Sequence, residues 1–213
     1  MGQGSHGVAL HDHDVGRFNR WSSHYDRSIL QHVLFGPVQE ATLKEAVREA
    51  NDVNAVLDIG CGTGRLLRRI ARQYPGAELV GVDPAPGMVR QAQSQGSSEQ
   101  HVEFVNAQAE KLPFPDASFD LVFTTVSFHH WADQSQGLNE VRRVLRNEGL
   151  FVLTDVMASG LFGRFLARRH VRGRFHSPGS LDEILRASRL HTVRRVSAPW
   201  PWQIKITVAR GTD

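Results

Sequence analysis

The chain is poor in several residue types, and each shortage excludes a class of protein. Cys61 is the single cysteine among 213 residues, so an internal disulfide and a cysteine metal cluster are excluded. We therefore expect a reducing, cytoplasmic location. No apolar run approaches the roughly 20 residues that a membrane helix needs, so no membrane span is expected. The N-terminal residues also lack the apolar centre of a signal peptide.

The sequence also lacks a large excess of either positive or negative charge, because the formal net charge is only +3. With so small an excess and no recognisable nucleic-acid-binding module, we expect no nucleic-acid partner. His6, His11 and His13 lie in a segment rich in Gly and Asp. We interpret residues 1–16 as a flexible N-terminus and expect no metal site there or elsewhere.

Short apolar segments alternate with amphipathic ones from residue 55 onward. The first four expected strands cover residues 55–59, 78–83, 102–106 and 119–126. Residues 147–156 are expected to form a turn followed by a fifth strand. The expected helices cover residues 37–50, 65–74, 86–94 and 133–145. Strands that alternate with helices predict an α/β fold with a parallel sheet and right-handed crossovers.

The C-terminal part of the sequence follows a different pattern. Ser180 and Glu183 have the spacing of a capping box, which predicts that a helix begins at Ser180. Residues 191–197 and 203–211 then have strand composition. The connection "APWPW" is too short to hold a crossover helix, so these two strands are predicted to be antiparallel.

Three glycines follow the first expected strand in "AVLDIGCGTGRLL", at positions 60, 62 and 64. Ligands of doubly wound sheets bind beyond the carboxyl ends of the strands, where this loop lies. A dinucleotide fingerprint would place its third glycine at position 65, which is Arg65. The spacing therefore disfavours a nicotinamide dinucleotide.

Four stretches of the sequence show a more specific resemblance. "VLDIGCGTGRLL" resembles the first motif of class I S-adenosylmethionine-dependent methyltransferases, and "GVDPAPGMV" resembles their second motif. "AEKLPFPDASFDLVFTTVSFHHW" is similar to the type 11 branch, which acts on small molecules and includes quinone-biosynthesis methyltransferases. "FNRWSSHYDRS" resembles the N-terminal cap segment of that branch. Together these stretches span about residues 18 to 155.

The resemblance implies a Rossmann-like, seven-stranded, mostly parallel sheet in the order 3-2-1-4-5-7-6. Strand 7 would be antiparallel, with helices on both faces and an N-terminal helical cap. Residues 17–213 would form a single methyltransferase domain. Its expected parts are a helical cap (17–52), a cofactor-binding core (53–156), a variable substrate lid (157–190) and a C-terminal hairpin (191–213).

The cofactor implied is S-adenosyl-L-methionine, with S-adenosyl-L-homocysteine as the product. Asp83 ends the second expected strand, where a carboxylate can accept hydrogen bonds from both ribose hydroxyls. The resemblance places Asp58 near the cofactor's amino group, although Asp58 could instead cap the amides of the loop. The other expected cofactor-binding residues are Tyr25, Gly60, Cys61, Gly62, Gly64, Pro84, Met88, Gln108, Ala109, Glu110 and Thr125.

Two of these residues, Cys61 and Gln108, need a separate interpretation. Cys61 is interpreted as a small residue that suits close packing, rather than as a reactive thiol. Gln108 stands where the family often has an aspartate that accepts from the adenine amino group. A glutamine can accept there as well, but it brings no charge, so a weaker contact to the adenine is expected.

The reaction implied is methyl transfer to a small, aromatic or apolar acceptor, on carbon, oxygen or nitrogen. His129 and His130 are the candidate catalytic bases, and His170 and His176 are weaker candidates. An aromatic set could line the acceptor pocket or simply pack the cap on the sheet: Phe18, Trp21, Tyr25, Phe128, Trp131, Phe162 and Phe165. A monomer or homodimer is expected. The alternatives are a non-catalytic S-adenosylmethionine-binding protein and an NAD-dependent oxidoreductase.

Overall fold

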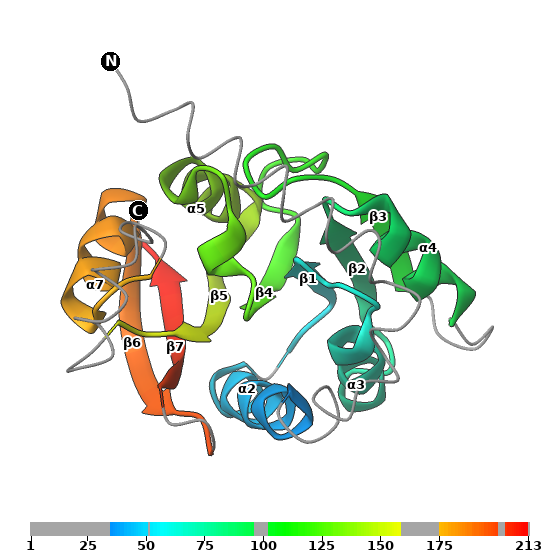
Figure 1. Cartoon of the computed structure of the whole chain (residues 1–213), viewed down its shortest axis with the longest axis horizontal. Coiled ribbons are helices and arrows are strands. Elements are labelled where there is room, and N and C mark those ends of the chain that lie inside the picture. Colours follow the sequence, from blue (N-terminus) through cyan, green and yellow to red (C-terminus); the bar gives the residue numbers. More distant parts are fainter. Residues whose placement is uncertain (1–34, 51, 96–101, 159–174, 200–202, 213) are drawn as a thin grey trace.

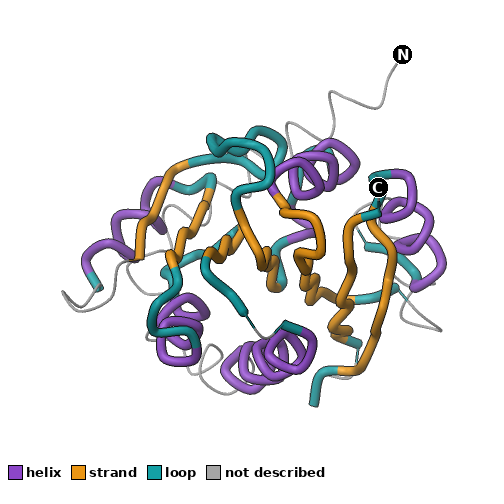
Figure 2. The backbone as a smooth tube through the Cα atoms, turned by 180° about the vertical axis from the view of Figure 1, so that it is seen from behind, coloured by secondary structure: helices purple, strands orange, loops and turns teal. Residues whose placement is uncertain are grey.

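A computed structural model describes residues 35–50, 52–95, 102–158, 175–199 and 203–212. In these residues, one mixed sheet lies between two layers of helices, as Figure 1 and, from behind, Figure 2 show. Several expectations lie outside the described residues: the flexible terminus, Tyr25 with the first part of the cap, and His170 with most of the lid.

The sheet has seven strands in the order β3-β2-β1-β4-β5-β7-β6, which confirms the predicted topology. The strands are β1 (Ala55–Ile59), β2 (Glu78–Asp83), β3 (Val102–Asn106), β4 (Phe119–Thr125), β5 (Leu145–Val156), β6 (Leu190–Ser197) and β7 (Ile204–Gly211). Pairs within β1–β5 are parallel, whereas β7 is antiparallel to both β5 and β6. The short connection after β6 forces that reversal.

The helices cover both faces of the sheet (Figure 1). They are α2 (Gly36–Glu49), α3 (Arg65–Gln73), α4 (Pro86–Ser94), the short 3₁₀ helix η2 (Phe128–His130), α5 (Gln134–Val144) and α7 (Pro178–Ala187). Apolar residues of α2, α3 and α4 form one buried cluster with the sheet, and those of α5 and α7 form another. Each helix therefore buries one stripe against the strands.

The strand β1 lies near the centre of the sheet, between β2 and β4. Four of its five residues are apolar, and all five are buried, as expected for a strand covered on both faces. Leu66, Leu67 and Ile70 of α3 pack against one face of the sheet. Because β1, β2, β4 and β5 run parallel, their carboxyl ends meet at one edge, and the loops that follow them lie together.

Two local predictions were wrong. The helix α7 begins at Pro178, and Ser177 is its N-cap, with Oγ accepting from the Ser180 amide at 3.2 Å. Ser180 therefore lies inside the helix and forms no capping box with Glu183. Proline is favoured at the first helical position, so the helix begins at Pro178 rather than at Ser180. The predicted turn at residues 147–149 lies inside β5 as an irregularity of register, with Glu148 at a φ of 65°.

Candidate functional site

The loop between β1 and α3 is left-handed at all three of its glycines. The φ angles of Gly60, Gly62 and Gly64 are 74°, 54° and 76°. A Cβ at Gly60 would lie 1.9 Å from the Ser127 Oγ, and one at Gly64 would lie 2.5 Å from the Phe104 ring. Packing within the protein thus requires these two glycines.

Gly62 differs from its neighbours, because a Cβ there would meet no atom of the described residues within 4 Å. Its amide donates a hydrogen bond of 2.9 Å to the Asp83 Oδ2. Gly62 is therefore the glycine whose missing side chain leaves open space beside a carboxylate. Of the three glycines in this loop, Gly62 is the one at which the described residues leave room for a ligand.

Asp83, the last residue of β2, ties two loops together. Its Oδ2 accepts from the Gly62 amide and its Oδ1 from the Ala85 amide, each at 2.9 Å. Burial raises the pKa of Asp83 to about 6, against the lowering by these two amide bonds. A carboxylate offers about four lone-pair sites, so both oxygens can still accept one further hydrogen bond.

Asp58 lies in β1 with only 2% of its surface exposed. Its Oδ1 has no hydrogen-bond partner in the described part of the chain. Burial, and secondly the charge of Asp83, raise the pKa of Asp58 to about 7. A buried carboxylate oxygen without a partner is costly, so this atom is suited to receive a donor from a bound molecule.

Thr125, at the end of β4, repeats this pattern. Asp58 is paired in register with Phe123, so Thr125, two residues further on, points to the same face of the sheet. The Thr125 Oγ1 is buried and has no partner among the described residues. Two unsatisfied oxygens therefore come from neighbouring strands on one face.

The expected adenine contacts lie around α4 and the loop after β3. Met88 is 2% exposed in the first turn of α4, and Ala109 is 6% exposed. Gln108 is exposed and forms an isolated antiparallel bridge with Lys111. The Glu110 Oε1 accepts from the Asp133 amide at 3.0 Å. The roles of these residues and of Pro84 toward a cofactor stay predictions.

Cys61 packs inside the molecule. It is 8% exposed and belongs to the apolar cluster around α3, and its Sγ lies 2.8 Å from the position of a Cβ on Gly81. Burial raises the pKa of the Cys61 thiol well above its usual range, and the charges of Asp83 and Asp58 raise it further. A neutral, enclosed thiol fits the packing interpretation.

The loop after β4 contacts the glycine loop directly. The Ser127 hydroxyl donates to the Ile59 carbonyl at 3.3 Å. Phe128 and Trp131 belong to the buried apolar cluster, with their ring centroids 5.0 Å apart in an edge arrangement. These two aromatics therefore pack the core, and the other members of the predicted aromatic set lie outside the described residues.

His129 contacts Asp155, a residue that the sequence interpretation missed. The His129 Nδ1 lies 2.7 Å from the Asp155 Oδ1, and the His129 amide donates to the Asp155 Oδ2 at 3.0 Å. Asp155 is 3% exposed at the end of β5. A signal was available, because Asp155 follows an apolar strand just as Asp58 and Asp83 do.

The two other candidate histidines within the described residues, His130 and His176, are placed differently. The His130 ring centroid lies 4.0 Å from that of His129. His176 uses both ring nitrogens: Nδ1 lies 2.9 Å from the Ser180 Oγ, and Nε2 lies 2.9 Å from the Gln134 Oε1. Burial lowers the pKa of His176, and the charge of Asp155 opposes that shift. Its contacts make His176 a link between α5 and α7.

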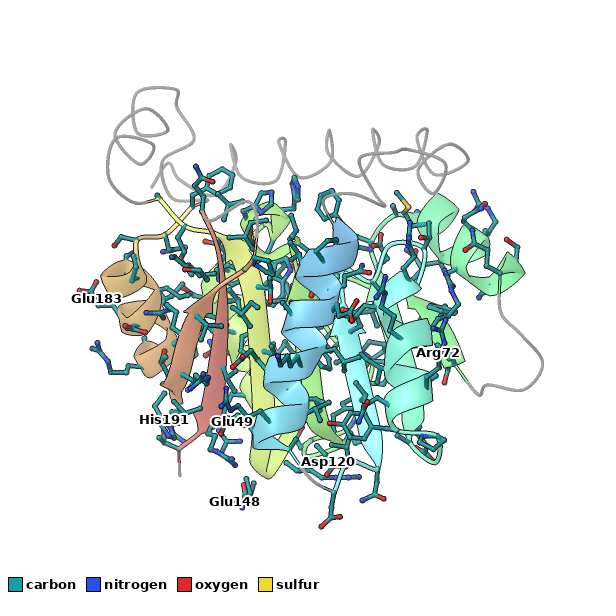
Figure 3. All side chains as sticks on the ribbon, turned by 90° about the horizontal axis from the view of Figure 1, so that it is seen from below. Glu49, Arg72, Asp120, Glu148, Glu183 and His191 are labelled. Carbon is teal, nitrogen blue, oxygen red and sulfur yellow. The ribbon has the colours of Figure 1, made fainter. Side chains whose placement is uncertain are left out.

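Figure 3 shows Asp120, Glu148 and His191 at the edge of the sheet where the parallel strands begin. The glycine loop and Asp83 lie at the other edge, where these strands end. Within the described ranges, no three His, Cys, Asp or Glu side chains gather as metal ligands would. None of the described helices has the length and apolar character required to span a membrane.

The comparisons with known proteins agree with this geometry. Residues 57–153 match the model of the type 11 methyltransferase domain. The predicted resemblance is thereby confirmed for the part of the chain that holds the glycine loop, Asp83 and His129.

Two curated relatives and one solved structure illustrate the similarity. The chain is 38% identical to a demethylmenaquinone methyltransferase of Deinococcus radiodurans, over 63% of this chain and 58% of the relative. It is 35% identical to a malonyl-[acyl-carrier protein] O-methyltransferase of Geobacter sulfurreducens, over 68% of this chain and 51% of the relative. The chain thus spans little more than half the length of these relatives.

The solved structure is the 1,6-didemethyltoxoflavin-N1-methyltransferase of Burkholderia thailandensis, with 1,6-didemethyltoxoflavin and S-adenosylhomocysteine bound. It is 21% identical, with a TM-score of 0.72, and the match covers 100% of this chain and 92% of that one. At this identity the match shows a common fold.

Proposed function

We propose that this chain binds S-adenosylmethionine and transfers its methyl group to a small aromatic or apolar molecule. The observation that carries the proposal is the buried, unpartnered Oδ1 of Asp58 beside the glycine loop. The family of residues 57–153 supports the same conclusion.

The residues present fit this cofactor. The ammonium group of its amino-acid end is the kind of donor that the Asp58 Oδ1 lacks. The lone pairs left on Asp83 suit two ribose hydroxyls, and the space at Gly62 leaves room for close approach to the backbone. Thr125, on the face of Asp58, is placed to accept or donate a further hydrogen bond at the same end.

The same arrangement disfavours a nicotinamide dinucleotide. A pyrophosphate carries negative charge and needs amide donors at a helix N-terminus. Here the Gly62 amide already binds Asp83, and the buried Asp58 lies in β1, two residues before the loop begins at Gly60. Two carboxylates would repel a phosphate group, whereas they attract a cation.

When bound, the cofactor supplies an electrophilic methyl group on a sulfonium. The task of the protein is to hold an acceptor in line with that methyl group, about 3 Å away. A small acceptor is consistent with the methyltransferase of known structure described above, which holds 1,6-didemethyltoxoflavin.

Isothermal titration calorimetry with S-adenosylhomocysteine tests the binding half of the proposal. We expect the wild type to bind it and to give no heat with NAD. Asp83→Asn should weaken binding by about 10- to 100-fold, because hydrogen bonds to charged groups contribute about 1.5–3 kcal/mol. Glu183→Gln, an exposed carboxyl on α7, is the matched control.

The proposal fails if NAD binds in place of S-adenosylhomocysteine, or if Asp83→Asn leaves the affinity unchanged. Transfer of a radiolabelled methyl group to an acceptor panel then tests catalysis. Binding without any transfer would favour the non-catalytic alternative.

A further inference from the structure

The pair formed by His129 and Asp155 has a defined protonation pattern. An ionised carboxylate can only accept hydrogen bonds. The contact of 2.7 Å between the His129 Nδ1 and the Asp155 Oδ1 therefore places the ring hydrogen on Nδ1. In the neutral ring, Nε2 is then left as the acceptor, which is the form that a proton-removing base requires.

The orientation of the His129 ring is fixed from several sides. The backbone amide of His129 is bound to the same carboxylate at 3.0 Å, so side chain and main chain are held together. The Phe175 ring stacks on the imidazole with centroids 4.7 Å apart and planes 22° apart. The side chain is 14% exposed, so little freedom of rotation is left.

The pair also lies next to the loop proposed to hold the cofactor. Ser127, two residues before His129, bonds the Ile59 carbonyl and lies against Gly60. His129 lies in η2, which follows β4, and Asp155 lies in β5. β4 and β5 are neighbouring strands whose carboxyl ends reach the same edge as those of β1 and β2.

We propose that His129 is the catalytic base of this site, that Asp155 is its positioning residue, and that the acceptor loses a proton on transfer. Such acceptors are phenols, enols and comparable N–H groups, and a carboxylate that is already ionised is excluded. This inference rests on the proposed function, because it assigns a role within the same methyl transfer.

The step balances without any further reactant. The acceptor X–H gives its proton to the His129 Nε2, and the electron pair of X attacks the methyl carbon. The bond between sulfur and that carbon breaks, with its electrons staying on the sulfur. The products are X–CH₃, S-adenosylhomocysteine and an imidazolium that Asp155 stabilises.

The titratable groups that contact His129 among the described residues include His130 from η2 and Asp155 from β5. The charge of Asp155 also acts on His176, from the segment before α7. His176 has both ring nitrogens engaged with Ser180 and Gln134. The contact of its Nδ1 with a buried carboxylate is the reason why we assign the base to His129.

Nitrogen NMR of the ligand-free protein tests the tautomer without any need for an acceptor. At a pH where the imidazole is neutral, the wild type should show a protonated Nδ1 and an unprotonated Nε2 for His129. Asp155→Asn should give a mixture of tautomers, whereas Glu183→Gln should leave the spectrum unchanged. A His129 protonated at Nε2 in the wild type would overturn the proposal.

Methyl transfer tests the role of the base, with 1-naphthol and 1-naphthoate as paired acceptors of similar shape. We expect transfer to the naphthol. His129→Gln should lower kcat about 100-fold while the affinity for S-adenosylhomocysteine stays within twofold. Asp155→Asn should also lower kcat, with a loss that shrinks at high pH, where naphthol ionises in solution.

Transfer to the naphthoate alone, or full activity in His129→Gln, would refute the assignment of the base while leaving the proposed function intact. The backbone bond from the His129 amide to Asp155 does not depend on the side chain at position 129. If the wild type does not bind S-adenosylhomocysteine at all, the proposed function itself fails, and this inference with it.

Discussion

Asp58 makes the stability of the ligand-free protein depend on pH in an unusual direction. Its pKa is raised from 3.8 to about 7, mainly by burial. The folded state therefore holds a proton that the unfolded chain has already released between these two values. The contribution of Asp58 to the free energy of unfolding is fully present below pH 4, and it is lost as the pH rises toward about 7.

The size of the effect follows from the same two values. Each pKa unit corresponds to about 1.4 kcal/mol, so between pH 5 and pH 8 the group should remove roughly 3 kcal/mol from the free energy of unfolding. Asp58→Asn cannot ionise and should lack this contribution. Asp83, with a pKa of about 6, adds a smaller decrease that both proteins share.

Urea unfolding at pH 5 and pH 8 measures the difference. The free energy of unfolding should fall more steeply in the wild type than in Asp58→Asn, by roughly 3 kcal/mol over this interval. Glu183→Gln should follow the wild type. Saturating S-adenosylhomocysteine should flatten the wild-type curve, because an ammonium beside Asp58 favours the ionised form. Equal slopes in the wild type and Asp58→Asn would refute the reasoning.

Two further predictions concern the frame of the site. Gly60→Ala should destabilise the fold by about 3 kcal/mol or more, because the new Cβ would meet the Ser127 Oγ and the φ is left-handed. Gly76→Ala, with open space around the position, should cost far less, and similar melting temperatures for the two variants would contradict the packing. Ser177→Ala should cost about 1 kcal/mol in chemical denaturation through loss of the cap of α7. A larger loss in Ser180→Ala than in Ser177→Ala would contradict that assignment.

The sequence predicts most helices and strands of this protein well, because the local pattern of apolar residues matches the burial that the fold imposes. The alternation of apolar strands with amphipathic helices is enough to predict β1–β5, and the length of one connection is enough to predict the reversal at β7. The strand order required the family resemblance. The start of α7 was wrong because a serine followed by proline competed with a capping box three residues later, and the two signals cannot both mark one helix end.

The candidate site was predictable only where a residue's role follows from its place on a strand. Asp58 and Asp83 were found by that rule, and Asp155 would have been found by it too. The link between His129 and Asp155 could not be predicted, because it joins a residue of η2 to a residue of β5 that lies 26 positions further along the chain. The reason for the glycines at 60 and 64 also required the structure, since Ser127 and Phe104 come from distant segments.

The position of β7 between β5 and β6 sets an order on assembly. In the described sheet β6 has β7 as its sole neighbour, so it has no partner until the ribosome has released the later strand. Until then β5 presents an open row of amide and carbonyl groups on the side away from β4. We therefore expect an intermediate of the nascent chain in which one edge of β5 is unpaired and prone to association. This edge becomes paired when β7 inserts between β5 and β6, which are both synthesised before it.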